Sequence, residues 1–185
     1  SVQGNILAGE EVIKAMARAF EAAKGQLAER LMIALEAGHA AGGDARGMQA
    51  GGILVVKPID DSSQTSDHWV DLRVDDSPNP FKELRRLLNI AIAGQHSRRA
   101  ARLAREGRFA DAIEAQQKAI AMNPKDDQLL YGLAQRYAQA GARANAIRAL
   151  EQAIARHAGW RLLAARNPAF DKIKDDPQFK KLVGQ

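Results

Sequence analysis

The sequence predicts an α+β fold in which a long amphipathic helix and a β-hairpin are followed by a wholly helical region. Three patterns predict it. Apolar residues recur every three, four or seven positions between Glu10 and Gly38, two short strand-like runs follow, and the second half repeats itself after 34 residues. With 185 residues, of which 46% are hydrophobic, the chain can bury one core of ordinary size or two small ones.

The first predicted element is a helix over residues 10–38. Gly25 is expected to break or loosen this helix, and Gly38 is expected to end it. The small residues of segment 41–47 then predict a tight loop. The apolar face of the helix carries Val12, Ile13, Met16, Phe20, Leu27, Leu31 and Leu35.

A β-hairpin is predicted after this loop. Residues 53–56 and 69–74 are its strands, and the polar stretch 60–67 is expected to form the turn between them. Leu72 and Val74 set the buried face of the second strand. Because an isolated hairpin is only marginally stable in water, we expect a segment from outside this chain to complete the sheet.

The second half resembles a pair of tetratricopeptide repeats. A period of 34 residues with small side chains at fixed positions is typical of this repeat, whose paired helices approach closely only where side chains are small. We expect residues 95–157 to form four antiparallel helices, with turns at Gly107, near Pro124 and at Gly141. The residues expected to be buried at the helix crossings are Ala112, Ala119, Ala146 and Ala153.

The first of the two repeats is degenerate. Polar residues, namely His96, Arg99 and Gln116, occupy positions comparable to those of large apolar residues in the second repeat. Residues 160–163 and 177–182 are expected to cap the last repeat, which would otherwise expose apolar surface. The predicted division of the chain is 1–80, a connecting helix over 81–94, and the repeats with their cap over 95–185.

Four ordered motifs near the start carry a further resemblance: Val2–Leu7, Gly42–Gln49, Ile53–Val56 and Asp71–Pro78. Together they resemble the C-terminal part of a bacterial family that is assigned to the N-terminal-nucleophile (Ntn) hydrolases and described only as a domain of unknown function. The resemblance covers residues 1–90. It implies an αββα sandwich of which the helix and hairpin form a part. It also implies that this chain is the C-terminal fragment of an amidohydrolase whose N-terminal Thr nucleophile is absent here.

Five residues are the candidate catalytic positions: Ser1, Gln3, Asn5, Asp44 and Arg46. A terminal Ser matches the nucleophile that such hydrolases activate with their own α-amine, and the alternative is an arbitrary chain start. The amides of Gln3 and Asn5 could stabilise an oxyanion or simply form a turn. A pair between Asp44 and Arg46 that fixes the loop is favoured over a ligand site.

The helical half predicts a binding function for a protein or peptide partner, or self-association. Stacked helix pairs form a concave surface, and the first helix of the second repeat supplies the side chains best placed to line it. The candidate binding residues are Gln128, Tyr131, Gln135 and Arg136. On this reading the protein interacts with partners through its repeats, whether or not the intact protein is an enzyme.

Other classes of function are disfavoured. The net charge is +5, with arginines crowded between Arg85 and Arg108, but no Phe, Tyr or Trp lies between Phe81 and Phe109 to stack on bases, so nucleic acid is an unlikely partner. The chain has no Cys and its four His have no i,i+4 partner, so neither a metal nor another cofactor is predicted. The longest apolar run, 52–56, is too short to span a bilayer.

Overall fold

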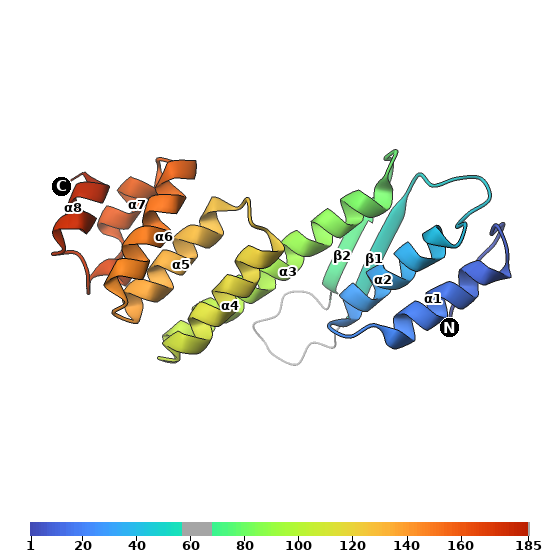
Figure 1. The fold of residues 1–185 in the computed structure, drawn as a ribbon, viewed down its shortest axis with the longest axis horizontal. Helices are drawn as coiled ribbons and strands as arrows, with labels where there is room; N and C mark the ends of the chain where they lie inside the picture. Colours follow the sequence, from blue (N-terminus) through green and yellow to red (C-terminus); the bar gives the residue numbers. More distant parts are fainter. Residues whose placement is uncertain (57–67, 185) are drawn as a thin grey trace. The chain divides into compact units, whose positions relative to one another are not determined.

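The computed structural model describes residues 1–56 and 68–184, which form two compact units, Ser1–Leu88 and Asn89–Gln185 (Figure 1). Each unit is described by itself. The order of elements is α1 (Glu10–Ala22), α2 (Leu27–Ala40), β1 (Gly51–Val56), β2 (His68–Val74), α3 (Pro80–Arg105), α4 (Phe109–Met122), α5 (Asp127–Gln139), α6 (Arg143–Arg156), α7 (Trp160–Arg166), the 3-10 turn η1 (Pro168–Phe170) and α8 (Pro177–Val183). The α+β class is therefore confirmed.

The predicted first helix is two packed helices. Gly25 lies in the link between α1 and α2 with φ +106°, a conformation that favours glycine, so the predicted break is confirmed. The second helix begins with a capping box, in which the Gln26 backbone N–H donates to Glu29 Oε2 at 3.1 Å.

The prediction that Gly38 ends the helix is wrong. Gly38 is buried inside α2, which continues to Ala40. A Cβ at this position would lie 2.6 Å from Met16 Cγ on α1, so the glycine allows the two helices to pack closely. The helix stops where Gly42 and Gly43, with φ +119° and +62°, turn the chain.

The two strands pair antiparallel, as predicted, with Gly51 opposite Val74 and Ile53 opposite Leu72. Val70 and Val74 are buried while Asp71 and Arg73 are exposed, so the predicted phase of the second strand is confirmed. The predicted turn at 60–67 lies outside the described residues. Within the described part of the chain the sheet has two strands, and the αββα sandwich stays a prediction.

The core of the first unit joins its helices to the start of α3. Leu84 and Leu88 on α3, and Met32 on α2, are fully buried. Arg85 Nε also donates to Glu36 Oε1 at 2.9 Å, which ties α3 to α2 by an ion pair. Apolar burial and this ion pair thus hold α2 and the start of α3 together.

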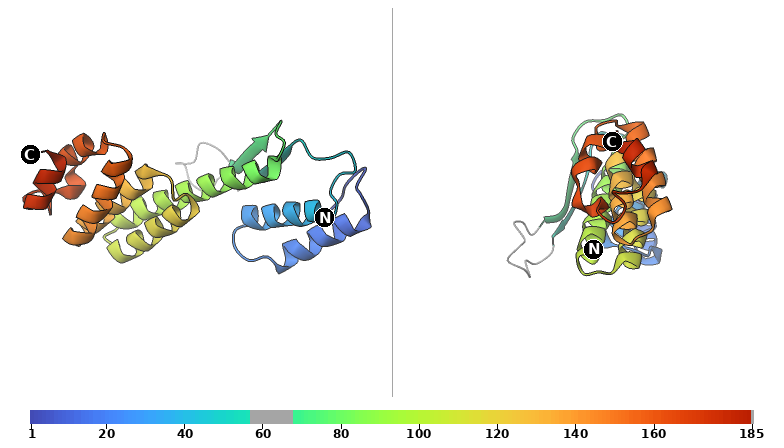
Figure 2. Two further views of the ribbon diagram at one scale, coloured as in Figure 1. Left: turned by 45° about the horizontal axis from the view of Figure 1, so that its top comes forward. Right: turned by 90° about the vertical axis from the view of Figure 1, so that its left-hand side faces the viewer.

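The second unit has the repeat architecture that the sequence predicts. Helices α4, α5 and α6 lie side by side and antiparallel in Figures 1 and 2, and the C-terminal part of α3 packs on α4 through Ala100 and Leu103. Gly107 and Gly141 both have φ +77°, as expected of the turns. Four alanines predicted at crossings have no exposed surface: Ala112, Ala119, Ala146 and Ala153.

Two features of this unit were not expected. Helix α3 runs without interruption from Pro80 to Arg105, through both the predicted connecting helix and the first helix of the repeats. The polar Gln116 of the degenerate repeat is buried and hydrogen-bonded: its Nε2 donates to Leu129 O at 2.9 Å, and its Oε1 accepts from Ser97 Oγ at 3.3 Å. Gln116 therefore links three helices where most repeats would pack apolar side chains.

The predicted caps form α7 and α8, which pack with η1 on the second repeat. Trp160 stacks on Tyr131 with ring centroids 4.4 Å apart, and its Nε1 donates to Asp127. Phe170 packs between Tyr131 and Phe179 with centroid distances of 5.8 and 5.5 Å. These aromatic contacts close the end of the repeat stack.

Candidate functional sites

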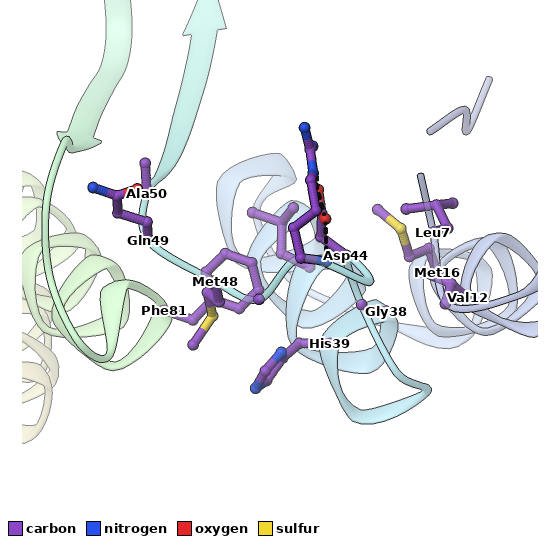
Figure 3. A pocket seen from close by; sticks show the side chains of 14 residues that line it. Leu7, Val12, Met16, Gly38, His39, Asp44, Met48, Gln49, Ala50 and Phe81 are labelled. Carbon is purple, nitrogen blue, oxygen red and sulfur yellow. Dashed lines mark hydrogen bonds and ion pairs between the residues drawn. The ribbon is translucent and has the colours of Figure 1, made fainter. Parts of the chain in front are cut away.

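The first unit contains an open pocket of about 810 Å³ (Figure 3). Apolar side chains of α1 and α2, together with Phe81 of α3, form one part of its wall. The loop 43–50 forms the other part and contributes polar groups, to which His39 of α2 adds its imidazole. Its lining includes Leu7, Met16, His39, Asp44, Arg46, Gln49 and Phe81.

Backbone hydrogen bonds hold this loop against the N-terminal segment. The Ala8 N–H donates to Gly43 O at 3.0 Å, and the Ala45 N–H donates to Ile6 O at 2.9 Å. Ile6 has φ +54°, which is unusual for a β-branched residue and is held by this pairing. The loop is therefore positioned by residues far from it in the sequence.

Asp44 and Arg46 form a bidentate ion pair in this loop. Arg46 Nε and Nη2 donate to the two carboxylate oxygens at 2.9 and 2.7 Å, and the Arg46 backbone N–H adds a bond at 2.8 Å. These bonds lower the pKa of Asp44 from 3.8 to about 2, and the same partner raises the pKa of Arg46. Each group satisfies the other, so the pair stabilises the loop and leaves neither charge uncompensated.

The other candidate catalytic residues lie elsewhere. Ser1, Gln3 and Asn5 are exposed and do not line the pocket. The pocket instead contains two polar residues that the sequence analysis did not single out. The His39 ring packs edge-on against Phe81 at 5.6 Å, and Gln49 Nε2 donates to Asp76 Oδ1 at 3.2 Å. No local signal marks them, because their partners are 42 and 27 residues away.

The second candidate site is the surface of α5. Gln128 is exposed, and Gln135 and Arg136 are half-buried on the same side of the helix. Tyr131 differs: it is 6% exposed, stacks on Trp160, and its hydroxyl accepts from Asn167 Nδ2 at 3.1 Å. Burial raises the pKa of this hydroxyl. The ring of Tyr131 thus belongs to the core, while its three neighbours remain available at the surface.

Arg136 has no carboxylate partner among the residues that the structure describes. Its Nη1 donates to Gln139 Oε1 at 2.9 Å and its Nη2 contacts Gln135 Oε1 at 3.5 Å, while its buried Nε has no hydrogen-bond partner among the described residues. Burial lowers the pKa of Arg136, and the nearby positive charge of Arg105 lowers it further. The guanidinium is therefore held in place by amides and lacks a counter-charge.

Among residues 1–56 and 68–184, no cluster of three or more His, Cys, Asp or Glu side chains could hold a metal ion. No helix there is long and apolar enough to cross a membrane.

The structure thus defines a protein with two parts, a small α+β unit with an open pocket and a unit of stacked helix pairs. Comparison with family models agrees with this division. Residues 1–84 match a family of unknown function (DUF1028), and residues 107–175 match a tetratricopeptide repeat. The chain therefore has a first segment similar to that family and a second similar to a tetratricopeptide repeat, in line with the two resemblances noted in the sequence. Searches of curated proteins and of solved structures each gave no match.

Proposed function

We propose that the helical unit binds another protein through the surface of α5 that carries Gln128, Gln135 and Arg136. Tetratricopeptide repeats commonly mediate protein–protein interaction, and this surface belongs to the second repeat. Gln128, Gln135 and Gln139 follow one another along one side of α5, so their amides can pair with the backbone of an extended segment.

The uncompensated charge of Arg136 carries the proposal. A half-buried cation normally pairs with a carboxylate, because desolvation without a counter-charge is costly. Within the described part of the chain, the guanidinium meets amide oxygens and the like charge of Arg105, and no carboxylate. A carboxylate of a partner protein beside the half-buried guanidinium would offset the repulsion from Arg105, so the partner is expected to present an acidic side chain or a C-terminal carboxylate there.

The test compares the wild-type chain with Arg136→Gln and with a matched control, Lys125→Gln, which removes an exposed charge outside this surface. Wild type and each variant are immobilised and exposed to a cell lysate, and the proteins that each retains are quantified by mass spectrometry. We expect a protein that wild type and Lys125→Gln retain and that Arg136→Gln loses at least five-fold, in the range for a charge-assisted hydrogen bond. Identical retention by all three would contradict the proposal.

Self-association is the second form that this interaction can take. A second copy would bury the same surface, so sedimentation velocity of the wild-type chain would then show a concentration-dependent dimer that Arg136→Gln weakens. If the wild-type chain is a monomer at all concentrations and still retains a partner, the surface binds a different protein and not a second copy of this chain.

For the first unit we propose, as the alternative function, that it is part of an Ntn-type amidohydrolase. Its pocket supports this because a loop with an ion pair and the amide of Gln49 borders an apolar wall, a combination typical of ligand pockets. The Thr nucleophile expected from the resemblance is absent from this chain, and Ser1 is exposed outside the pocket. Reading the coding sequence upstream of Ser1 for a domain with a processed Thr start is the test, and a gene that begins at Ser1 would count against it.

A further inference from the structure

A second groove in the helical unit lies where α6, α7 and α8 meet, and it has a volume of about 590 Å³. Its apolar part comes from Ile147 on α6 and Leu182 on α8. Ile147 belongs to the core of the unit, and Leu182 is half-buried against the same core. The apolar floor of the groove is therefore formed by side chains that are packed in or against the core.

Three cations surround this floor, and each comes from a different helix: Arg148 from α6, Arg161 from α7 and Lys181 from α8. Among the described residues none of the three has a hydrogen bond or an ion pair to a side chain. One carboxylate, that of Glu151, lines the same groove. The site consequently has an excess of positive charge that the surrounding structure does not compensate.

Several other cations of the unit are paired with carboxylates. Arg108 pairs with Asp111, Lys118 with Glu114, and Arg143 with Asp176 at 3.4 Å. Asp111, Glu114 and Asp176 are thus engaged outside the groove.

The charge of the whole unit favours an anionic partner as well. Residues 89–185 contain 17 Lys and Arg against 9 Asp and Glu, a net charge of +8, whereas residues 1–88 have a net charge of −3. A field of this sign raises the local concentration of acidic segments near the groove and increases their rate of association.

We propose that this groove binds an acidic segment of a partner protein, which inserts one aliphatic side chain between Ile147 and Leu182 and places carboxylates beside the three cations. The apolar floor fits an aliphatic side chain, and the cations on three sides fit flanking carboxylates. Nucleic acid is the less suitable ligand because no aromatic side chain lines the groove to stack on a base. The site is separate from the α5 surface and does not depend on Arg136.

The experiment uses the full chain and three labelled synthetic peptides at low salt, with binding measured by fluorescence anisotropy. The first peptide is Glu-Glu-Leu-Glu-Glu. In the second, Gln replaces every Glu, and in the third, Ser replaces Leu. We expect the first to bind at least five-fold more tightly than either of the others. Equal binding of the first and second peptides would overturn the proposal.

Variants then locate the bound peptide. Arg148→Gln and Arg161→Gln are each expected to weaken binding about three-fold, the effect of one exposed ion pair. The double variant should weaken it about ten-fold. Ala144→Glu, which places a negative charge on the wall of the groove, should also weaken it. Lys125→Gln and Arg136→Gln should change it less than 1.5-fold, and this separates the groove from the α5 surface.

Two results would contradict the assignment. If Lys125→Gln weakens binding as much as Arg148→Gln, the peptide senses only the net charge of the unit. If an oligothymidylate binds more tightly than the acidic peptide and loses affinity in Arg148→Gln, the groove is a nucleic-acid site. Far-UV circular dichroism checks that each variant is folded. Of the five substituted side chains, Lys125, Ala144, Arg148 and Arg161 are exposed and Arg136 is half-buried.

Discussion

At the scale of single residues, the ion pair between Asp44 and Arg46 shows how a short motif fixes its own loop. Two residues apart, they bond through both side chains and through the Arg46 backbone. The residue types and spacing allowed this pair to be predicted. The size of the fall in the Asp44 pKa could not be predicted from the sequence, because one of the three hydrogen bonds that cause it comes from the Arg46 backbone.

The first prediction concerns this pKa. In the wild-type chain the Asp44 carboxyl should titrate at about 2, and in Arg46→Gln it should return toward 3.8, as measured by NMR titration of the carboxyl carbon. Because the folded-state pKa is lowered, the pair is fully formed above about pH 4. It is lost as the pH falls toward 2. An Asp44 that titrates near 3.8 in the wild type would show that the ion pair does not persist in solution.

The second prediction concerns the close contact between Gly132 and the side chain of Gln116. Gly132→Ala would place a Cβ 2.8 Å from Gln116 Nε2, which must then leave its bond to Leu129 O. A buried amide without its partner costs roughly 1–3 kcal/mol, more than the roughly 1 kcal/mol that alanine contributes in a helix. We expect a net loss of about 1 kcal/mol in the free energy of unfolding, measured with urea.

Two companion variants make this prediction specific. Gly94→Ala, in α3, meets only the end of the flexible Arg98 side chain, so it should leave stability unchanged or raise it. In the background of Gln116→Ala, the substitution Gly132→Ala should no longer destabilise, because the clash is gone. Additive effects of Gly132→Ala and Gln116→Ala would rule out the proposed contact.

At the scale of elements, regular periods were predictable and long-range contacts were not. The 34-residue repeat predicted α4, α5, α6 and their turns because the same small residues recur at the same crossings. Gly38 was misinterpreted as a helix end because a glycine needed for close packing and a glycine needed for a turn look alike in the sequence. Only its partner Met16, on another helix, distinguishes the two roles.

The candidate sites show the same limit. Arg136 was identified because its helix and its side of that helix followed from the repeat. Tyr131 was placed on the same side, yet its ring is buried by Trp160, which follows 29 residues later. The groove of α6, α7 and α8 was not predictable at all, because Arg148, Arg161 and Lys181 belong to three helices and share no local pattern.

The third prediction tests the closing helix α7. Trp160→Ala removes the stack on Tyr131 and the bond to Asp127. The site is half-buried, so we expect a loss of about 2 kcal/mol, below the roughly 3–5 kcal/mol of a fully buried aromatic residue. Leu162→Ala, in the same helix but 59% exposed, should change stability by less than about 0.5 kcal/mol. Urea unfolding followed by circular dichroism compares them, and equal effects would mean that α7 contributes through helix propensity alone.

At the scale of the whole molecule, the two units differ in charge, in architecture and in the function proposed for each. Each has its own buried core, with Met32, Leu84 and Leu88 in the first and Ala146 and Leu150 in the second. Substitutions on the surface of one unit can therefore leave the fold of the other unit unaltered. The repeat unit can therefore bind partners whatever activity the pocket of the first unit supports.

The last prediction tests whether the cores are energetically separate. Ala146→Leu forces three extra carbon atoms into a helix crossing with no exposed surface, which should cost about 1–3 kcal/mol. Native-state hydrogen exchange should then accelerate for amides of α5 and α6, while the amides of α1 and α2 keep their wild-type protection. The control Ala155→Leu, exposed on the same helix, should leave both sets unchanged. If protection of α1 and α2 falls together with that of α5 and α6, the two units unfold as one cooperative body through α3, which contributes residues to both.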